Sequence, residues 1–123
     1  GRFSMKQSDK TMSYLDDMLN ALKHTARFIE NMSYETFRHD DKTLFALKHA
    51  LGIVGQTAQK MPLSLREQYP NIPWREMARM PDKLAYDHIG VSQMVLWQTA
   101  RVDLPALAPA LDAMLIRVKD AMG

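Results

Sequence analysis

Histidine and arginine are the residues of this sequence that could move a proton or bind a phosphate near neutral pH. The four histidines are His24, His39, His49 and His88. The first two fall on polar stretches, which predicts solvated surface positions. His49 lies on a helical face beside two glycines, and His88 ends a later helical segment. If those two faces meet, one cleft could hold both rings.

Several other kinds of catalytic site lack the residues they need. The 123 residues include no cysteine, which excludes disulfide scaffolds, thiol catalysis and cysteine zinc sites. The sequence has no glycine-rich phosphate loop, no His-Glu-x-x-His pair and no Glu-x-x-His pattern of the diiron proteins. It therefore predicts neither a metal nor another cofactor. The ten methionines are spread along the chain and are interpreted as adaptable core filling.

Composition predicts one soluble domain. The chain is 46% hydrophobic and 24% charged, and its net charge of +2 is too small to indicate nucleic acid by itself. No run approaches the roughly 18 apolar residues of a membrane span, and no signal peptide is expected. We therefore expect a cytoplasmic protein with no membrane contact. Residues 1–4 are interpreted as a remnant of an expression vector, with the domain spanning residues 5–123.

Helical periodicity predicts the elements that must position these residues. Apolar residues at three- and four-residue steps predict long amphipathic helices over about 9–31 and 41–60, with short helical turns at 33–37 and 64–68. A third helix is expected to begin at Trp74, and at Pro81 it either bends or gives way to a new helix that has the proline in its first turn; this element ends at Gly90. Two further helices are expected, one over 91–99 and one that Asp103 caps, with Pro105 in its first turn. The predicted fold is all-α, an antiparallel up-and-down four-helix bundle with additional short helices.

Two glycines lie inside the second long helix. Gly52 and Gly55 each cost up to about 1 kcal/mol relative to alanine at such positions. They therefore predict that another helix or a ligand approaches closely on that side, and packing is the favoured reason.

Residues 66–107 read REQYPNIPWREMARMPDKLAYDHIGVSQMVLWQTARVDLPAL. This stretch closely resembles the HepT-like branch of the HEPN family. The matching positions, all in register, are Tyr69 and Pro70, residues 72–75, Met80, residues 82–84, Gly90 and Val91, Trp97, Thr99 and residues 103–105. The upstream segments MSYETF and LGIVGQTAQKM also resemble their counterparts. The resemblance covers nearly the whole chain from about residue 8.

The resemblance implies a helical homodimer that cleaves RNA at a site in the dimer cleft. Such proteins are toxins of toxin-antitoxin pairs, and their partner is a minimal nucleotidyltransferase that silences them by adenylylating a tyrosine. The family's site motif is an arginine, four residues, a histidine, one residue and a tyrosine. Metal is not required, because the arginine can steady the scissile phosphate while the histidine handles protons during attack by the ribose 2′-OH.

This sequence departs from the family at the motif itself. In register, Pro81 stands at the arginine position, Tyr86 at the histidine position and His88 at the tyrosine position. Proline carries no charge, and a phenol with a pKa of about 10 is a poorer base near neutral pH than an imidazole of about 6.5. Arg79 and His88 each lie two residues from the lost groups, which is a rotation of about 200° on an ideal helix. We take Arg79, Tyr86 and His88 as the candidate catalytic residues.

Five other positions are candidates for the cleft or for RNA binding, namely His49, Gln56, Arg75, Asp82 and Lys83. Gln56 stands where the family usually carries an acidic residue, directly after the glycine matched by Gly55. His49 stands where a basic residue is common. These departures therefore gather on the face that is expected to line the cleft.

Three functions fit this pattern. The first is an RNase toxin that retains weak activity through Arg79 and His88. The second, favoured over a rewired nuclease, is a catalytically degenerate member that keeps the dimer and the nucleotidyltransferase partner as a binding module. The third is a helical interaction domain with no link to RNA.

A homodimer is expected through the third helix and the C-terminal helix. Trp74, Met77, Met80, Met94 and Trp97 supply more large apolar surface than a thin bundle can readily cover. Aromatic and methionine side chains are common in interface cores.

Overall fold

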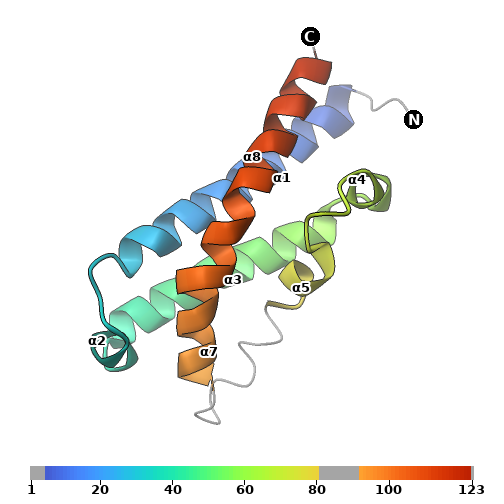
Figure 1. The fold of residues 1–123 in the computed structure, drawn as a ribbon. Coiled ribbons are helices and arrows are strands. Elements are labelled where there is room, and N and C mark those ends of the chain that lie inside the picture. The colour runs from blue at the N-terminus through green and yellow to red at the C-terminus, as the bar shows by residue number, and fades with distance from the viewer. Residues whose placement is uncertain (1–4, 81–91, 123) are drawn as a thin grey trace.

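The computed structural model describes residues 5–80 and 92–122, and all regular structure in these ranges is helical (Figure 1). The long helices are α1 (Met5–Phe28), α3 (Asp41–Lys60) and α8 (Leu104–Ala121), and α8 continues from α7 (Ser92–Gln98) through a π-helical segment, η2 (Thr99–Asp103). The short helices are α2 (Tyr34–Arg38), α4 (Leu63–Gln68) and α5 (Trp74–Ala78). The all-α prediction is confirmed.

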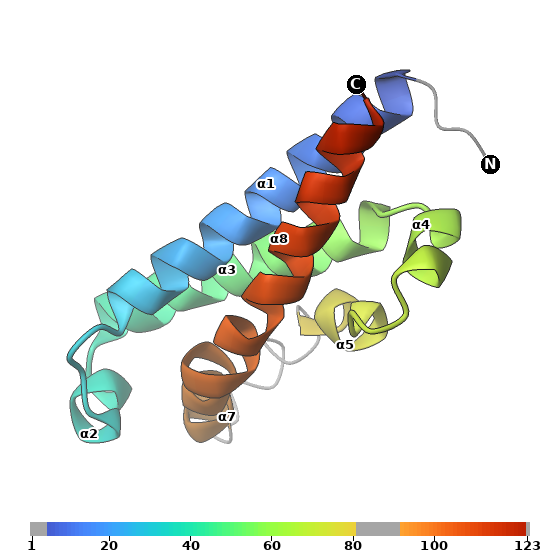
Figure 2. The same ribbon diagram turned by 45° about the horizontal axis from the view of Figure 1, so that its top comes forward.

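Helix α1 is central to the arrangement because it packs against both α3 and α8. The first turn of α1 and the last turn of α8 lie at the same end of the molecule, and α2 lies beside α7 at the other end (Figures 1 and 2). Helix α5 packs on α3. The fourth long helix of the predicted bundle would extend α5 through residues 81–90, which lie outside the described residues, so the four-helix bundle stays a prediction.

The ends of the helices have local causes. Helix α1 ends three residues earlier than predicted, and Asn31, just after it, has a φ of 63°, a left-handed conformation that asparagine tolerates and that reverses the chain. The Ser33 hydroxyl then accepts the Thr36 amide N–H at 3.1 Å and so caps α2. The Asp40 carboxylate accepts both the amide N–H of Thr43, at 3.3 Å, and its hydroxyl, at 3.0 Å, which caps α3.

The core lies where α1 and α3 meet the continuous C-terminal helical segment formed by α7, η2 and α8. Its fully buried side chains include Leu15, Met18, Leu47, Leu51, Val54, Leu104, Leu111 and Met114. The buried polar residues are threonines, and the hydroxyls of Thr25, Thr57 and Thr99 each donate to the carbonyl four residues earlier, at 2.6–2.8 Å. These bonds satisfy hydroxyls that would otherwise be costly to bury. Within the described ranges no helix is long and apolar enough to cross a bilayer.

The prediction of two separate C-terminal helices is wrong, because α7, η2 and α8 form one continuous rod. Asp103 has helical dihedral angles of −67° and −48°, and its side chain makes no capping hydrogen bond. The Leu104 amide N–H donates to the Thr99 carbonyl, five residues back, which is the hydrogen-bond pattern of a π-helix. Pro105 has no N–H to donate to Arg101, so the wider turn falls where an α-helical bond is missing anyway.

The predicted surplus of apolar surface is also largely wrong. Trp74, Met77 and Met80 are at most 5% exposed within a single chain. The Trp97 ring lies 5.0 Å from that of Phe37, in an aromatic cluster between α7 and α2. Of the five residues expected to form an interface, Met94 alone is exposed. A homodimer would therefore need a different surface from the one that the sequence predicted.

The close helix packing predicted at the glycines of α3 does not occur at Gly52. A Cβ atom built on Gly52 meets no atom within 4 Å, so packing against this chain does not require glycine there. Gly55, by contrast, is buried. The two glycines therefore have different surroundings, which their shared periodicity did not indicate.

Replacing Gly52 with alanine should stabilise the protein by about 0.5–1 kcal/mol, because the methyl group fits open space and alanine loses less backbone entropy in a helix. Urea denaturation followed by circular dichroism measures the change. Gln56→Ala, at an exposed position one turn later, is the matched control and should change stability by less than about 0.5 kcal/mol. A destabilised Gly52→Ala variant would contradict the open surroundings described for this position.

Candidate functional site

Helix α5 carries the candidate arginines on a short amphipathic turn. Trp74, Met77 and Met80 are buried, and the Trp74 indole N–H donates to the Tyr69 carbonyl at 3.1 Å. Arg75 and Arg79 point the other way and are exposed. The amide N–H of Arg79 donates to the carbonyl of Arg75 at 3.2 Å, so the two arginines follow one another by one turn. The burial of one face thus fixes two cations on the other.

A hydrogen bond ties this turn to α3. The Gln59 side-chain amide donates to the Ala78 carbonyl at 2.8 Å. Ala78 directly precedes Arg79, and Gln56 lies one helical turn before Gln59. We call this junction, defined by Gln56, Gln59, Arg75 and Arg79, the α3–α5 seam. The predicted site residues Gln56, Arg75 and Arg79 each lie within one helical turn of the Gln59–Ala78 bond along their own segments.

Arg66 of α4 holds the end of α3 in place. Its guanidinium donates to the carbonyl oxygens of Ala58, Gln59 and Met61, each at 2.9 Å. These carbonyls lie at the C-terminal end of α3, where the Ala58 carbonyl also accepts the Met61 amide N–H at 3.2 Å. A cation suits this negative end of the helix dipole. The sequence analysis gave Arg66 no role, because a cap that reaches back over five to eight residues has no short motif.

His49 lies on α3, seven residues before Gln56 of the seam. It is exposed and lines a groove of about 500 Å³ between α1 and α3. The groove is lined by Asp17, Asn20, Ala21, His24, Phe28, Ala46, His49, Ala50 and Ile53. The His24 ring stacks on the Phe28 ring at 6.1 Å between centroids, with 18° between the planes. His24 is exposed as predicted, yet it shares this groove with His49, a pairing that depends on how α1 and α3 align.

Several predicted site residues fall outside the described residues. These are Asp82, Lys83, Tyr86 and His88, together with Pro81 of the altered motif. Arg79 is thus the one candidate catalytic residue that the structure places. In the part of the chain that the structure describes, no group of three histidine, aspartate or glutamate side chains could hold a metal ion. The described geometry offers cations and hydrogen-bond donors to a ligand.

Comparison with known proteins gives a consistent result over most of the chain. A family model described as ribonuclease HepT-like matches residues 18–114. A protein of Thermococcus cleftensis named "Probable ribonuclease HepT" is 42% identical over 84% of this chain and 92% of its own length. A protein of Methanocaldococcus jannaschii, named as a candidate RNase, is 32% identical over 91% of this chain and 84% of its own. No solved structure matches.

Replacing Arg66 with methionine should destabilise the protein by about 2 kcal/mol, because three carbonyls at the end of α3 lose their charged donor while the apolar stem is kept. Thermal and urea denaturation measure the loss. Arg75→Met is the matched control, since that exposed side chain makes no such bonds with the described residues, and it should shift stability by less than about 0.5 kcal/mol. Equal stabilities for the two variants would refute the capping role.

Proposed function

We propose, from the premise that this chain belongs to the ribonuclease HepT-like family, that it is a cytoplasmic RNA-directed protein whose strand cleavage is strongly reduced. The observation that carries this proposal is the overlap of the family match with the α3–α5 seam. The match over residues 18–114 includes both arginines of α5. Two exposed guanidinium groups one turn apart suit the phosphates of a nucleic acid.

The proposed chemistry is transesterification: the ribose 2′-oxygen bonds to the neighbouring phosphorus, and the bond from phosphorus to the 5′-oxygen breaks. The 5′-oxygen leaves as a hydroxyl once it is protonated, and a 2′,3′-cyclic phosphate remains. A base must remove the 2′-hydroxyl proton, and positive charge must stabilise the phosphate in the transition state. Arg79, at the end of α5, supplies the charge in this proposal. Tyr86 stands at the position of the family's base, and a phenol with a pKa of about 10 accepts a proton poorly near neutral pH. His88 is the better base but stands two residues from that position. Slow cleavage follows, because the proton must go to this displaced imidazole.

A second candidate function is a non-catalytic binding module. The observation that favours it is the replacement of all three motif residues, by Pro81, Tyr86 and His88. Under this alternative the chain keeps the helical fold and its protein partner but has no nuclease activity. RNA cleavage by the purified chain distinguishes the two functions.

We further propose a minimal nucleotidyltransferase as the protein partner, on the basis of the resemblance described above. His88 stands where the family's acceptor tyrosine would be, and an imidazole is not the phenol hydroxyl that normally takes an AMP group. On an ideal helix, a residue two positions earlier, as Tyr86 is, would lie about half a turn away from that position. AMP transfer by such a partner should therefore be poor, and mass spectrometry of the mixed proteins with ATP would detect it at Tyr86.

A homodimer is also part of the proposal, now through the outer face of α7 and η2. Met94, Val95 and Val102 are 41–56% exposed there, and exposed apolar side chains grouped on one face are typical of an interface.

Val102→Asp should convert the dimer, of about twice the chain mass, into a monomer of 14.1 kDa. The reason is that the new carboxylate would lose its water at the interface. Light scattering measures this. Ile116→Asp, on an exposed site of α8, should leave the mass unchanged, and a monomeric wild type would refute the dimer.

Purified wild-type chain in EDTA should cleave RNA slowly, and both Arg79→Ala and His88→Ala should abolish that cleavage. The triple variant Pro81→Arg, Tyr86→His, His88→Tyr should cleave about 10²-fold faster or more, because it restores a base and a phosphate-binding cation, whereas Pro81→Arg alone should not. Gel analysis of a labelled RNA gives the rates.

Lys119→Ala, an exposed cation on α8, is the control for loss of charge alone and should cleave like the wild type. No cleavage by wild type, with RNA still bound, would favour the binding module. A folded triple variant without activity would refute the claim that the motif alone limits the chemistry.

A further inference from the structure

We propose that the outer face of α3 binds single-stranded RNA and that Phe45 stacks one of its bases. The face is defined by Phe45, His49, Gly52, Gln56 and Gln59, which we call the α3 stripe. The proposal rests on the RNA-directed function proposed above and adds a substrate path to it. The path runs from the α3–α5 seam towards the beginning of α3.

The five residues of the α3 stripe share one side of the helix. At 100° per residue their directions fall within about 80° of one another. Gly52 is half-buried and the other four are exposed. The Gln59 bond to Ala78 places the C-terminal end of the stripe beside α5. From Phe45 to Gln56 the helix rises about 16 Å, room for four to five stacked nucleotides at about 3.4 Å each.

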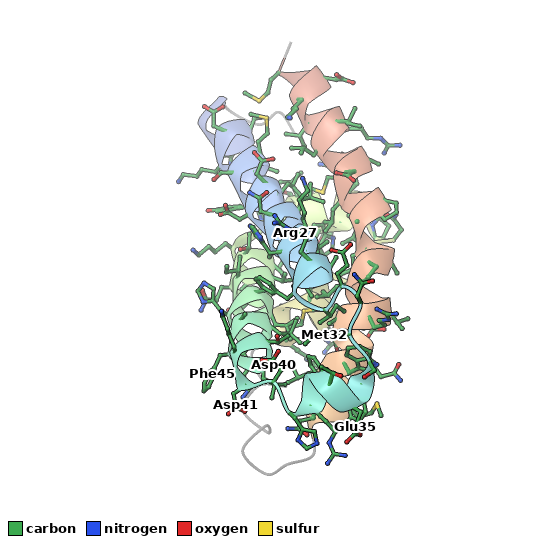
Figure 3. The ribbon with its side chains drawn as sticks, turned by 90° about the vertical axis from the view of Figure 1, so that its left-hand side faces the viewer. Arg27, Met32, Glu35, Asp40, Asp41 and Phe45 are labelled. Atoms are coloured by element: carbon green, nitrogen blue, oxygen red, sulfur yellow. The ribbon has the colours of Figure 1, made fainter. Side chains whose placement is uncertain are left out.

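Phe45 is the most exposed large apolar side chain among the described residues, at 71%. Figure 3 shows it at the outer edge of α3, on the side away from α1. The Lys48 ammonium lies 5.5 Å from the centre of its ring. An aromatic ring beside a cation is the combination with which proteins bind single strands, because the ring stacks on a base while the cation attracts phosphate.

The charge of α3 favours a polyanion on this stripe. From Lys42 to Lys60 the helix carries three lysines and no aspartate or glutamate. The acidic residues Asp40 and Asp41 lie at its N-terminal end, where the Asp40 carboxylate is engaged as a cap. The exposed Asp41 lies one turn before Phe45 on the same side, so the favourable stretch for a polyanion begins at Phe45. A second copy of the chain on this stripe would bring two such cationic helices face to face. RNA therefore fits the stripe better than self-association does.

Gly52 gives the stripe a bare stretch of backbone at its centre. With open space where a Cβ would be, the glycine costs stability that no contact with residues 5–80 or 92–122 recovers. Close approach of a ribose or phosphate to the helix backbone would give this glycine a use. The exposed ring and the bare backbone are thus two independent observations that point to one ligand on one face.

The test is binding of a fluorescent 2′-O-methyl RNA oligonucleotide to the full chain, measured by anisotropy at fixed salt. This probe lacks the attacking hydroxyl, so binding is measured without cleavage. Phe45→Ala should weaken binding about tenfold, within the range known for loss of one stacked base. Phe45→Trp should retain affinity, and Phe45→Leu should match the alanine variant. Ile116→Ala, at an exposed apolar site on α8, is the control and should bind normally.

Gly52 supplies a readout that a purely structural role would not give. Gly52→Ala should bind the oligonucleotide less tightly, by about threefold or more, even though the same variant is expected to be more stable. Gly52→Glu should lose most of the binding, because it adds bulk and a like charge facing the phosphates. Unchanged affinity in both variants would overturn the proposed path.

The outcomes separate this inference from the proposed function. If wild type binds RNA and Phe45→Ala binds equally well, the stripe is not the path, and the RNA-directed function stands. If wild type binds no RNA, both fall. If Phe45→Ala turns a dimer into a monomer in light scattering, the stripe is an interface between copies, and the RNA path is overturned.

Discussion

Burial of one face of α5 against α3 is the constraint on which the candidate site depends. A helix of five residues is not stable alone in water, since nucleation is unfavourable and few hydrogen bonds follow it. Trp74, Met77 and Met80 each offset that cost by removing a large apolar side chain from water, about 1.5–3 kcal/mol apiece by area. Their burial also sets the direction of Arg75 and Arg79. The positions of both cations are thus a product of core packing, and a loss of core packing would move them.

The long helices could be predicted because their periodicity and their caps agree. Asp40 caps α3, and the α3 boundaries match the predicted range of 41–60. The continuity of α7 with α8 could not be predicted in this way. Asp103 followed by Pro105 has the local signature of a new helix, and only the packing of both halves into one core decides that the chain runs on as a π-helical turn. A tertiary contact overrode a correct local rule.

The candidate site, too, could be predicted only where its residues are close in sequence. Residues of one short segment, such as Arg75 and Arg79, could be grouped from sequence, because one turn of helix relates them. Gln59 and Arg66 were missed, since each bonds to backbone atoms and its partner depends on how the chain folds back. At Gly52 a neighbour was predicted that is not there. Periodicity correctly placed this glycine inside a helix, but periodicity carries no information on whether another element packs against it.

The π-helical turn has a mechanical consequence for the whole molecule. One extra residue in a turn rotates everything after it by about 100°, so α7 can turn its inner face to α2 while α8 turns its own to α1. The Gln93 side chain of α7 donates to the Arg38 carbonyl of α2 at 3.2 Å, and α8, at the other end of the same rod, packs along α1. One π-helical turn thus sets the angle between the face of the rod that meets α2 and the face that meets α1.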